Sequence, residues 1–137
     1  MTENSKPDRL LEKYKTRTRN LFNGRQSLTS NELRDTWRNY VRGWCNYFSL
    51  ANERYWRKPI SGWTRRHIRK CFWLRWHGSK GRRRNLEKLG VHPKTIKRTN
   101  LAGAAWPMAK HFAMNAALNN RRLVELGFLT PSDFAAK

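Results

Sequence analysis

Residues 29–51, TSNELRDTWRNYVRGWCNYFSLA, and residues 60–76, ISGWTRRHIRKCFWLRW, carry the strongest structural signals in the chain. In the first stretch apolar residues recur at spacings of three and four, which places them on one face of a helix. Thr29 and Glu32 have the spacing of a capping box, which predicts where this helix begins. The residues expected to be buried on its apolar face include Trp37, Trp44 and Phe48.

The second stretch predicts a helix with two different sides. One side carries mostly apolar residues and is expected to pack into the core: Ile60, Trp63, Ile68, Cys71 and Leu74. The other side interleaves basic residues with Phe72, Trp73 and Trp76. These aromatic rings could stack on unpaired bases, at about 1–3 kcal/mol per base, or they could belong to the core, and we favour the core. For the basic residues of this side we favour nucleic-acid contact. We also expect the protein to fold when Arg65, Arg66 and Arg69 are replaced with glutamine. The basic residues of this side are Arg65, Arg66, Arg69 and Lys70.

The remaining segments also predict helices, because none shows sustained period-two alternation. We expect a first helix over residues 7–20, a basic loop over 77–84, a short helix ending at Gly90, another starting at Pro93, a pair between residues 107 and 126, and a last turn at Thr130. The chain is therefore predicted to be all-α. The expected organisation is an N-terminal tail and first helix over 1–28, a helical domain over 29–90 and a C-terminal helical extension over 91–137.

Charge is the strongest signal in the composition. Thirty Lys and Arg stand against nine Asp and Glu, for a net charge of +21, and residues 57–98 hold fifteen Lys or Arg with one acid. Self-repulsion of this size indicates a polyanionic partner, and nucleic acid is favoured over an anionic membrane because no long apolar run is present. No signal peptide opens the sequence, so we expect a cytoplasmic protein with no membrane partner. The predicted nucleic-acid contacts are Arg38, Arg42, Arg65, Arg66, Arg69, Lys70, Trp73, Arg75, Trp76, Lys80, Arg82, Arg83, Arg84, Lys94, Lys97 and Arg98.

The sequence shows no pattern of a catalytic or metal site. It has no glycine-rich phosphate loop, no HExxH and no carboxylate pair placed to hold two metals. Cys45 and Cys71 lack zinc-ligand spacing, and we expect both thiols to be reduced. His67 and Cys71 share a helix face, but two ligands are too few for a metal. We therefore expect no enzyme activity, no cofactor and no bound metal.

A series of motifs in fixed order resembles a known family. The motifs are RGWCNYF at 42–48 followed by Ala51-Asn52, WTRRHIRK at 63–70 with Trp73 and Trp76, NLEKLG at 85–90, Trp106, ALNN at 117–120 and LVELGF at 123–128. Together they resemble the group II intron maturase-specific domain, over roughly residues 16–134.

The resemblance implies a thumb-like helical bundle, the X region found at the C-terminal end of intron-encoded reverse transcriptases. Such a unit binds the parent intron RNA and supports its splicing and mobility, and the part after it is linked with target DNA. We expect the chain to lack the fingers, the palm and their metal-binding acids, and so to be an RNA-binding module. Three alternatives stay open: the C-terminal part of a split or truncated reverse transcriptase working with a separately encoded chain, a remnant without function, and a generic DNA-binding helical protein.

Overall fold

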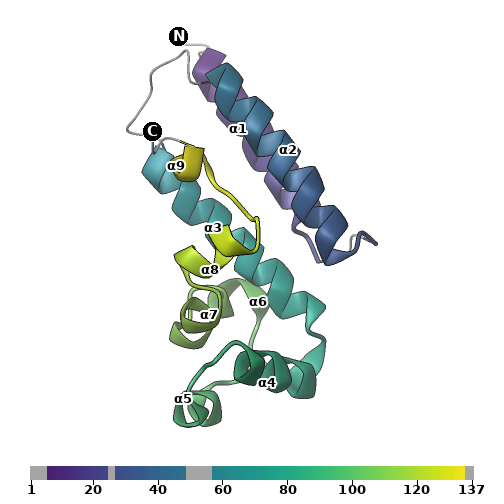
Figure 1. Cartoon of the computed structure of the whole chain (residues 1–137), viewed down its shortest axis with the longest axis vertical. Helices are drawn as coiled ribbons and strands as arrows, with labels where there is room; N and C mark the ends of the chain where they lie inside the picture. Colours follow the sequence, from purple (N-terminus) through teal and green to yellow (C-terminus); the bar gives the residue numbers. More distant parts are fainter. Residues whose placement is uncertain (1–5, 25–26, 49–56, 135–137) are drawn as a thin grey trace.

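The computed structural model describes residues 6–24, 27–48 and 57–134. Within these ranges it contains helices and no strand, which confirms the predicted all-α class (Figure 1). The helices are α1 (Lys6–Leu21), α2 (Ser30–Phe48), α3 (Arg57–Arg75), α4 (Gly78–Lys88), α5 (Pro93–Arg98), α6 (Ala105–Met108), α7 (Phe112–Ala117), α8 (Asn120–Glu125) and α9 (Pro131–Phe134).

Helices α1 and α2 form an antiparallel hairpin along one side of the molecule (Figure 1). The predicted capping box is present at the start of α2: the Thr29 N–H donates to Glu32 Oε1 at 2.9 Å, and the Glu32 N–H donates to Thr29 Oγ1 at 3.1 Å. These bonds satisfy amide groups that have no partner within the helix. Trp37 and Trp44 are buried as predicted, whereas the side chain of Phe48 lies outside the described part.

An aromatic cluster fills the space between the hairpin and α3. The ring centroid of Tyr14 lies 5.6 Å from Trp37 and 4.7 Å from Trp44, and Phe22 lies 5.0 Å from Trp37. The Tyr14 hydroxyl also forms a buried 2.7 Å hydrogen bond with Thr64 Oγ1 of α3. This hydrogen bond joins α1 to α3. Burial raises the pKa of Tyr14 far above its usual value, so the hydroxyl stays protonated.

Helix α3 is the central element, and its bounds are close to those of the helix predicted over residues 60–76. It contacts α1 on one side and α6 and α9 on another, because the C-terminal segment returns along it (Figure 1). The indole N–H of Trp37 donates to the carbonyl of Leu129 at 2.7 Å, which fixes this returning segment to α2 as well. Helix α3 is therefore covered on more than one side.

The predicted basic loop over residues 77–84 is wrong, because nearly all of it belongs to helix α4. The change of direction takes place within two residues, His77 with φ +51° and Gly78 with φ +71°. Gly81 allows α4 to approach α3, since a Cβ at this position would collide with the carbonyl oxygen of Trp76. The glycines that suggested a loop instead serve a tight turn and a close helix contact.

The predicted pair of helices between residues 107 and 126 is present as α7 and α8, and a further short helix, α6, precedes the pair. Helices α6, α7 and α8 follow one another with breaks between them. Side chains cap two of them: His111 Nδ1 accepts from the Ala113 N–H at 3.1 Å, and Asn119 Oδ1 accepts from the Arg122 N–H at 2.7 Å. The short helices at Pro93 and after Thr130 begin where the sequence predicted them.

Candidate nucleic-acid interface

Two arginines of α3 are part of the internal framework. Arg66 donates to the carbonyl of Trp106 from Nε at 3.1 Å and from Nη2 at 2.9 Å, and its guanidinium lies 3.8 Å from the centre of the Trp106 ring. Arg69 is 6% exposed and donates to the carbonyl of Leu118 at 2.7 Å and to Asn120 Oδ1 at 3.0 Å. Burial lowers the pKa of Arg69 to about 10, so it remains charged at neutral pH. Both side chains hold the C-terminal extension against α3.

Two further arginines bind backbone carbonyls in the same way. Arg75 Nη2 donates to the carbonyl of Leu28 at 2.7 Å, which joins α3 to the turn before α2. Arg82 of α4 donates to the carbonyl of Trp73 at 3.0 Å and to that of Leu101 at 2.8 Å. Arginine suits this role because its several N–H donors can reach more than one acceptor at once.

In the structure the three arginines on the predicted basic side of α3, for which nucleic-acid contact was predicted, are engaged within the fold. Arg66 and Arg69 are engaged with backbone carbonyls, and Arg65 donates to Thr130 Oγ1 at 3.2 Å. Trp73 is fully buried and its indole N–H donates to the carbonyl of Gly103 at 2.9 Å, so this ring belongs to the core. The reason is that the C-terminal segment packs against α3 and meets these side chains.

A different set of cations is exposed on α4 and α5, at one end of the molecule (Figure 1). These residues, which we call the α4–α5 basic surface, are Lys80, Arg83, Arg84, Lys88, Lys94, Lys97 and Arg98. None of them forms an ion pair within the described residues, and Glu87 is the one acid between residues 57 and 98. All but Lys88 were predicted site residues. Lys88 follows Arg84 by four positions, which is the helical spacing that could have revealed it.

Other predicted contacts lie elsewhere. Arg38 and Arg42 are exposed on α2, where Arg38 is 3.4 Å from Asp35 and Arg42 donates to Asn39. Figure 1 places α2 away from α4 and α5. Lys70 is half-buried beside His67, with 3.2 Å between its Nζ and His67 Nδ1. The fold therefore does not combine these three cations with the α4–α5 basic surface.

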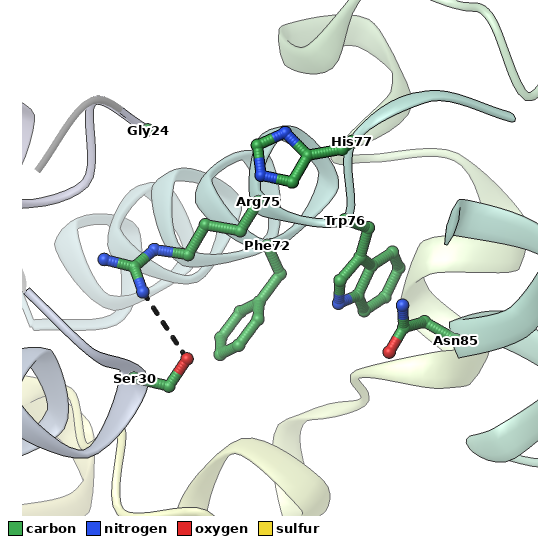
Figure 2. Close-up of a pocket in the computed structure, with 7 residues that line it drawn as sticks. All are labelled: Gly24, Ser30, Phe72, Arg75, Trp76, His77 and Asn85. Atoms are coloured by element: carbon green, nitrogen blue, oxygen red, sulfur yellow. Dashed lines mark hydrogen bonds between the residues drawn. The ribbon is translucent and has the colours of Figure 1, made fainter. Parts of the chain in front are cut away.

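The prediction overlooked a set of cations on α1. Arg19 lies 5.4 Å and Lys15 6.0 Å from the ring centre of Trp63, and Arg17 lies 5.7 Å from that of Tyr40. The prediction treated residues 7–20 only as a helix, and no strong local signal in the sequence marks these cations. Trp76, a predicted aromatic contact, is partly exposed at the end of α3 and lines a cavity (Figure 2).

The residues with metal-binding chemistry are buried separately. His67 lies between the rings of Trp63 and Trp106, at 4.3 Å and 4.6 Å, and burial together with the charge of Lys70 lowers its pKa to about 4. Burial raises the pKa of the Cys45 thiol to about 11. Across the described ranges, no three His, Cys, Asp or Glu side chains gather as a metal site would require.

None of the described helices is both long enough and apolar enough to cross a membrane.

The described residues form a small all-helical domain with an exposed, strongly basic end, which is an architecture typical of nucleic-acid-binding proteins. The sequence profile described as "Group II intron, maturase-specific domain" matches residues 11–90, which include most of α1 and all of α2, α3 and α4. The chain belongs to this family, which confirms the resemblance seen in its motifs. The family's domain is the non-catalytic part of intron-encoded reverse transcriptases. No individual curated protein matches the chain.

Proposed function

We propose that this chain binds structured group II intron RNA through the α4–α5 basic surface and supports splicing or mobility of that RNA, with no catalytic site of its own. The observation that carries the proposal is the set of exposed cations on two adjoining helices, none of which has an ion-pair partner among the described residues. Membership of the maturase-specific family supports intron RNA as the polyanion.

Hydrogen bonds within the fold hold α4 and α5 in place, which supports this function indirectly. Arg82 joins α4 to α3 and to the loop after α5 through the carbonyls of Trp73 and Leu101. Helix α5 is capped by His92, whose Nδ1 accepts from the Lys94 N–H at 3.1 Å. Cations on such well-fixed helices can meet several phosphates with little loss of backbone freedom. Each contact releases counterions from the RNA, so the affinity should depend strongly on salt.

The test measures binding to a group II intron RNA over a series of salt concentrations. One variant replaces Lys80, Arg83 and Arg84 with Gln, and a second replaces Lys94, Lys97 and Arg98. We expect each variant to bind more weakly. We also expect the plot of log affinity against log salt to become less steep, by about 0.7–0.9 for every phosphate that the variant no longer neutralises. Salt-independent binding by the unmodified chain would contradict the proposal.

The control variant removes the same charge from α1 by replacing Arg9, Lys13 and Arg17, all of which are exposed. We expect a smaller loss of affinity, because this helix lies at the other end of the molecule (Figure 1). An equal loss would mean that the α4–α5 basic surface is not the binding site. Tighter binding to duplex DNA of equal length than to the intron RNA would instead favour a DNA-binding protein.

The absence of activity in the isolated chain is part of the proposal. We expect the purified protein neither to extend a primer nor to cleave nucleic acid in Mg²⁺, because such chemistry needs acids that hold two metals. Primer extension that needs a separately encoded reverse-transcriptase chain would show that this chain is one part of a split enzyme. Extension by the pure chain would refute the proposed non-catalytic role.

A further inference from the structure

A cavity of about 560 Å³ opens where α3 meets α4 (Figure 2). This volume falls in the range of pockets that bind small ligands, about 300–1,000 Å³. Its lining combines aromatic rings, a side-chain amide and a guanidinium: Gly24, Ser30, Phe72, Arg75, Trp76, His77 and Asn85. Such a mixed lining suits a flat ligand that has both an aromatic face and polar edges.

The two aromatic side chains have different roles in this cavity. Trp76 follows directly after α3 and lies one turn beyond Phe72, with the two ring centroids 6.3 Å apart. Phe72 also packs edge-to-face on Phe128 at 5.3 Å and 85°, so it belongs to the wall. Trp76 is partly exposed at the end of the helix, which leaves its indole available for stacking.

The polar groups of the cavity are held in place from outside it. Asn85 Nδ2 donates to the carbonyl of Gly81 at 2.8 Å, and its Oδ1 accepts no hydrogen bond from the described residues. Arg75 donates to the Leu28 carbonyl and, at 3.5 Å, to Ser30 Oγ, while its Nε is buried without a hydrogen-bond partner among the described residues. The cavity therefore offers an oriented amide acceptor beside a fixed positive charge.

The turn at the cavity carries backbone strain at a residue with a polar ring. His77 lines the cavity and has φ +51° and ψ +95°, which lies outside the left-handed well that His, Asn and Asp enter more readily than other residues with a side chain. Such strain persists only where the surroundings hold it, and it is found most often at functional sites. Helix α4 begins directly after this turn and carries Lys80, Arg83 and Arg84 on its exposed side.

We propose that this cavity receives one unpaired nucleobase from a bulge or loop of the RNA that the chain binds. The base stacks on the indole of Trp76, an N–H on its edge donates to Asn85 Oδ1, and the adjoining phosphates lie along the cations of α4. This inference rests on the proposed RNA-binding function and adds recognition of a flipped-out base to it. Proteins that select RNA commonly read unpaired bases in this way, because paired bases expose too little of their faces.

The first test uses the unmodified full chain and an RNA hairpin that carries one bulged purine. The same hairpin with an abasic site at the bulge, and a fully paired version, are the comparison ligands. We expect the bulged RNA to bind about 5- to 150-fold more tightly than the abasic RNA, which is the effect expected of one stacked base. A bulged 2-aminopurine should also lose fluorescence on binding. Equal affinity for bulged and abasic RNA would overturn the inference.

The second test replaces Trp76→Leu, which keeps an apolar side chain but removes the stacking surface. This variant should lose the preference for the bulged RNA and keep the affinity and the salt slope of the unmodified chain for paired RNA. The control is Phe112→Leu, since Phe112 is an aromatic residue that is 71% exposed outside the cavity. It should change neither property. An equal loss on all three RNAs with W76L would mean that Trp76 has only a structural role.

These outcomes separate the two proposals. Weak, salt-independent binding to every RNA would contradict the RNA-binding function itself, whereas salt-dependent binding without preference for a bulged base would contradict only the role of the cavity. If the Trp76→Leu chain does not fold, the affinities of the unmodified chain for bulged and for abasic RNA still test the inference. Competition by free AMP at concentrations similar to those of the RNA would assign the cavity to a free nucleotide instead.

Discussion

Arg69 and Arg83 lie in the same basic stretch but have opposite surroundings. Arg69 is buried and donates to a carbonyl and an amide oxygen of the C-terminal extension, whereas Arg83 is exposed on α4. A buried guanidinium with two fixed acceptors stabilises the fold, since its loss leaves those acceptors without a donor. An exposed guanidinium without an ion-pair partner contributes little to stability and remains available for a ligand.

This contrast predicts different effects of the same substitution. Arg69→Gln should lower the free energy of unfolding by about 1–3 kcal/mol, because the Leu118 carbonyl loses a charged donor. Arg83→Gln should change it by less than about 0.5 kcal/mol. Urea denaturation of both variants measures the difference. If the two changes prove equal, Arg69 does not hold the C-terminal extension in place.

His67 predicts a pH dependence of stability. Its pKa is lowered to about 4 in the folded protein, against ~6.5 in an unfolded chain. Between these values the unfolded state binds a proton that the folded state does not bind, so stability should fall as the pH drops from about 6.5 to about 4. The total loss should be on the order of 3 kcal/mol, and the full stability should be present above the upper value.

Denaturation at several pH values measures this effect, and the range from about pH 5 to 6.5 is the clearest because most carboxyl groups titrate lower. His67→Gln should remove most of the slope in that range. His77→Gln is the matched control, since it makes the same substitution at an exposed histidine whereas His67 is buried. A slope that survives in the His67 variant would assign the dependence to other groups.

Among the elements, the contact between α3 and α4 depends on a single glycine. Gly81 faces the carbonyl of Trp76 at the end of α3, and any Cβ would collide with it. The neighbouring Arg82 donates to the Trp73 carbonyl from the same turn of α4. The direction of α4, and with it the placement of the α4–α5 basic surface, therefore depends on this close contact.

Gly81→Ala should consequently destabilise the protein by about 2–4 kcal/mol, in spite of the higher helix propensity of alanine. The matched control is Gly43→Ala in α2, where nothing lies within 4 Å of the added Cβ. There the propensity gain should prevail and raise stability by about 0.5–1 kcal/mol. Thermal melting of the two variants tests the pair, and stabilisation by both would show that α4 can move away from α3 at little cost.

Across the molecule as a whole, charge repulsion acts against the compact state. The net charge is +21, and the ion pairs in the described part involve Asp35 and Glu125 on exposed surface. The Asp35 pKa is lowered by its hydrogen bond with Arg34, but such exposed pairs contribute little. The fold therefore depends on its aromatic core and on neutral acceptors for its arginines, and its stability depends on screening by salt.

Added salt should stabilise the RNA-free protein while it weakens RNA binding. We expect the melting temperature to rise between about 0.05 and 0.5 M ionic strength, because screening shortens the reach of the repulsion from roughly 14 Å to 4 Å. The variant with Gln at Lys80, Arg83, Arg84, Lys94, Lys97 and Arg98 should show a smaller rise. A melting temperature that falls with salt would mean that attractive ion pairs, and not repulsion, dominate the surface.

Features that depend on neighbours along the chain could be predicted from the amino-acid sequence alone. The all-α class, the capping box of Thr29 and Glu32, the buried face of α2 and the family motifs follow from spacings of a few residues, and the structure and the family match confirm them. These signals are reliable because one helical turn brings residues three and four apart to the same face.

Which basic residues are structural and which are exposed depends instead on tertiary packing. Arg66 and Arg69 reach carbonyls 40 and 49 residues further along the chain, so nothing in their own helix shows that they are occupied. The same holds for α4, whose direction depends on how Gly81 meets the end of α3. The N–H donors of an arginine can bind a phosphate or a backbone carbonyl, and the packing of distant segments determines which of the two the side chain meets.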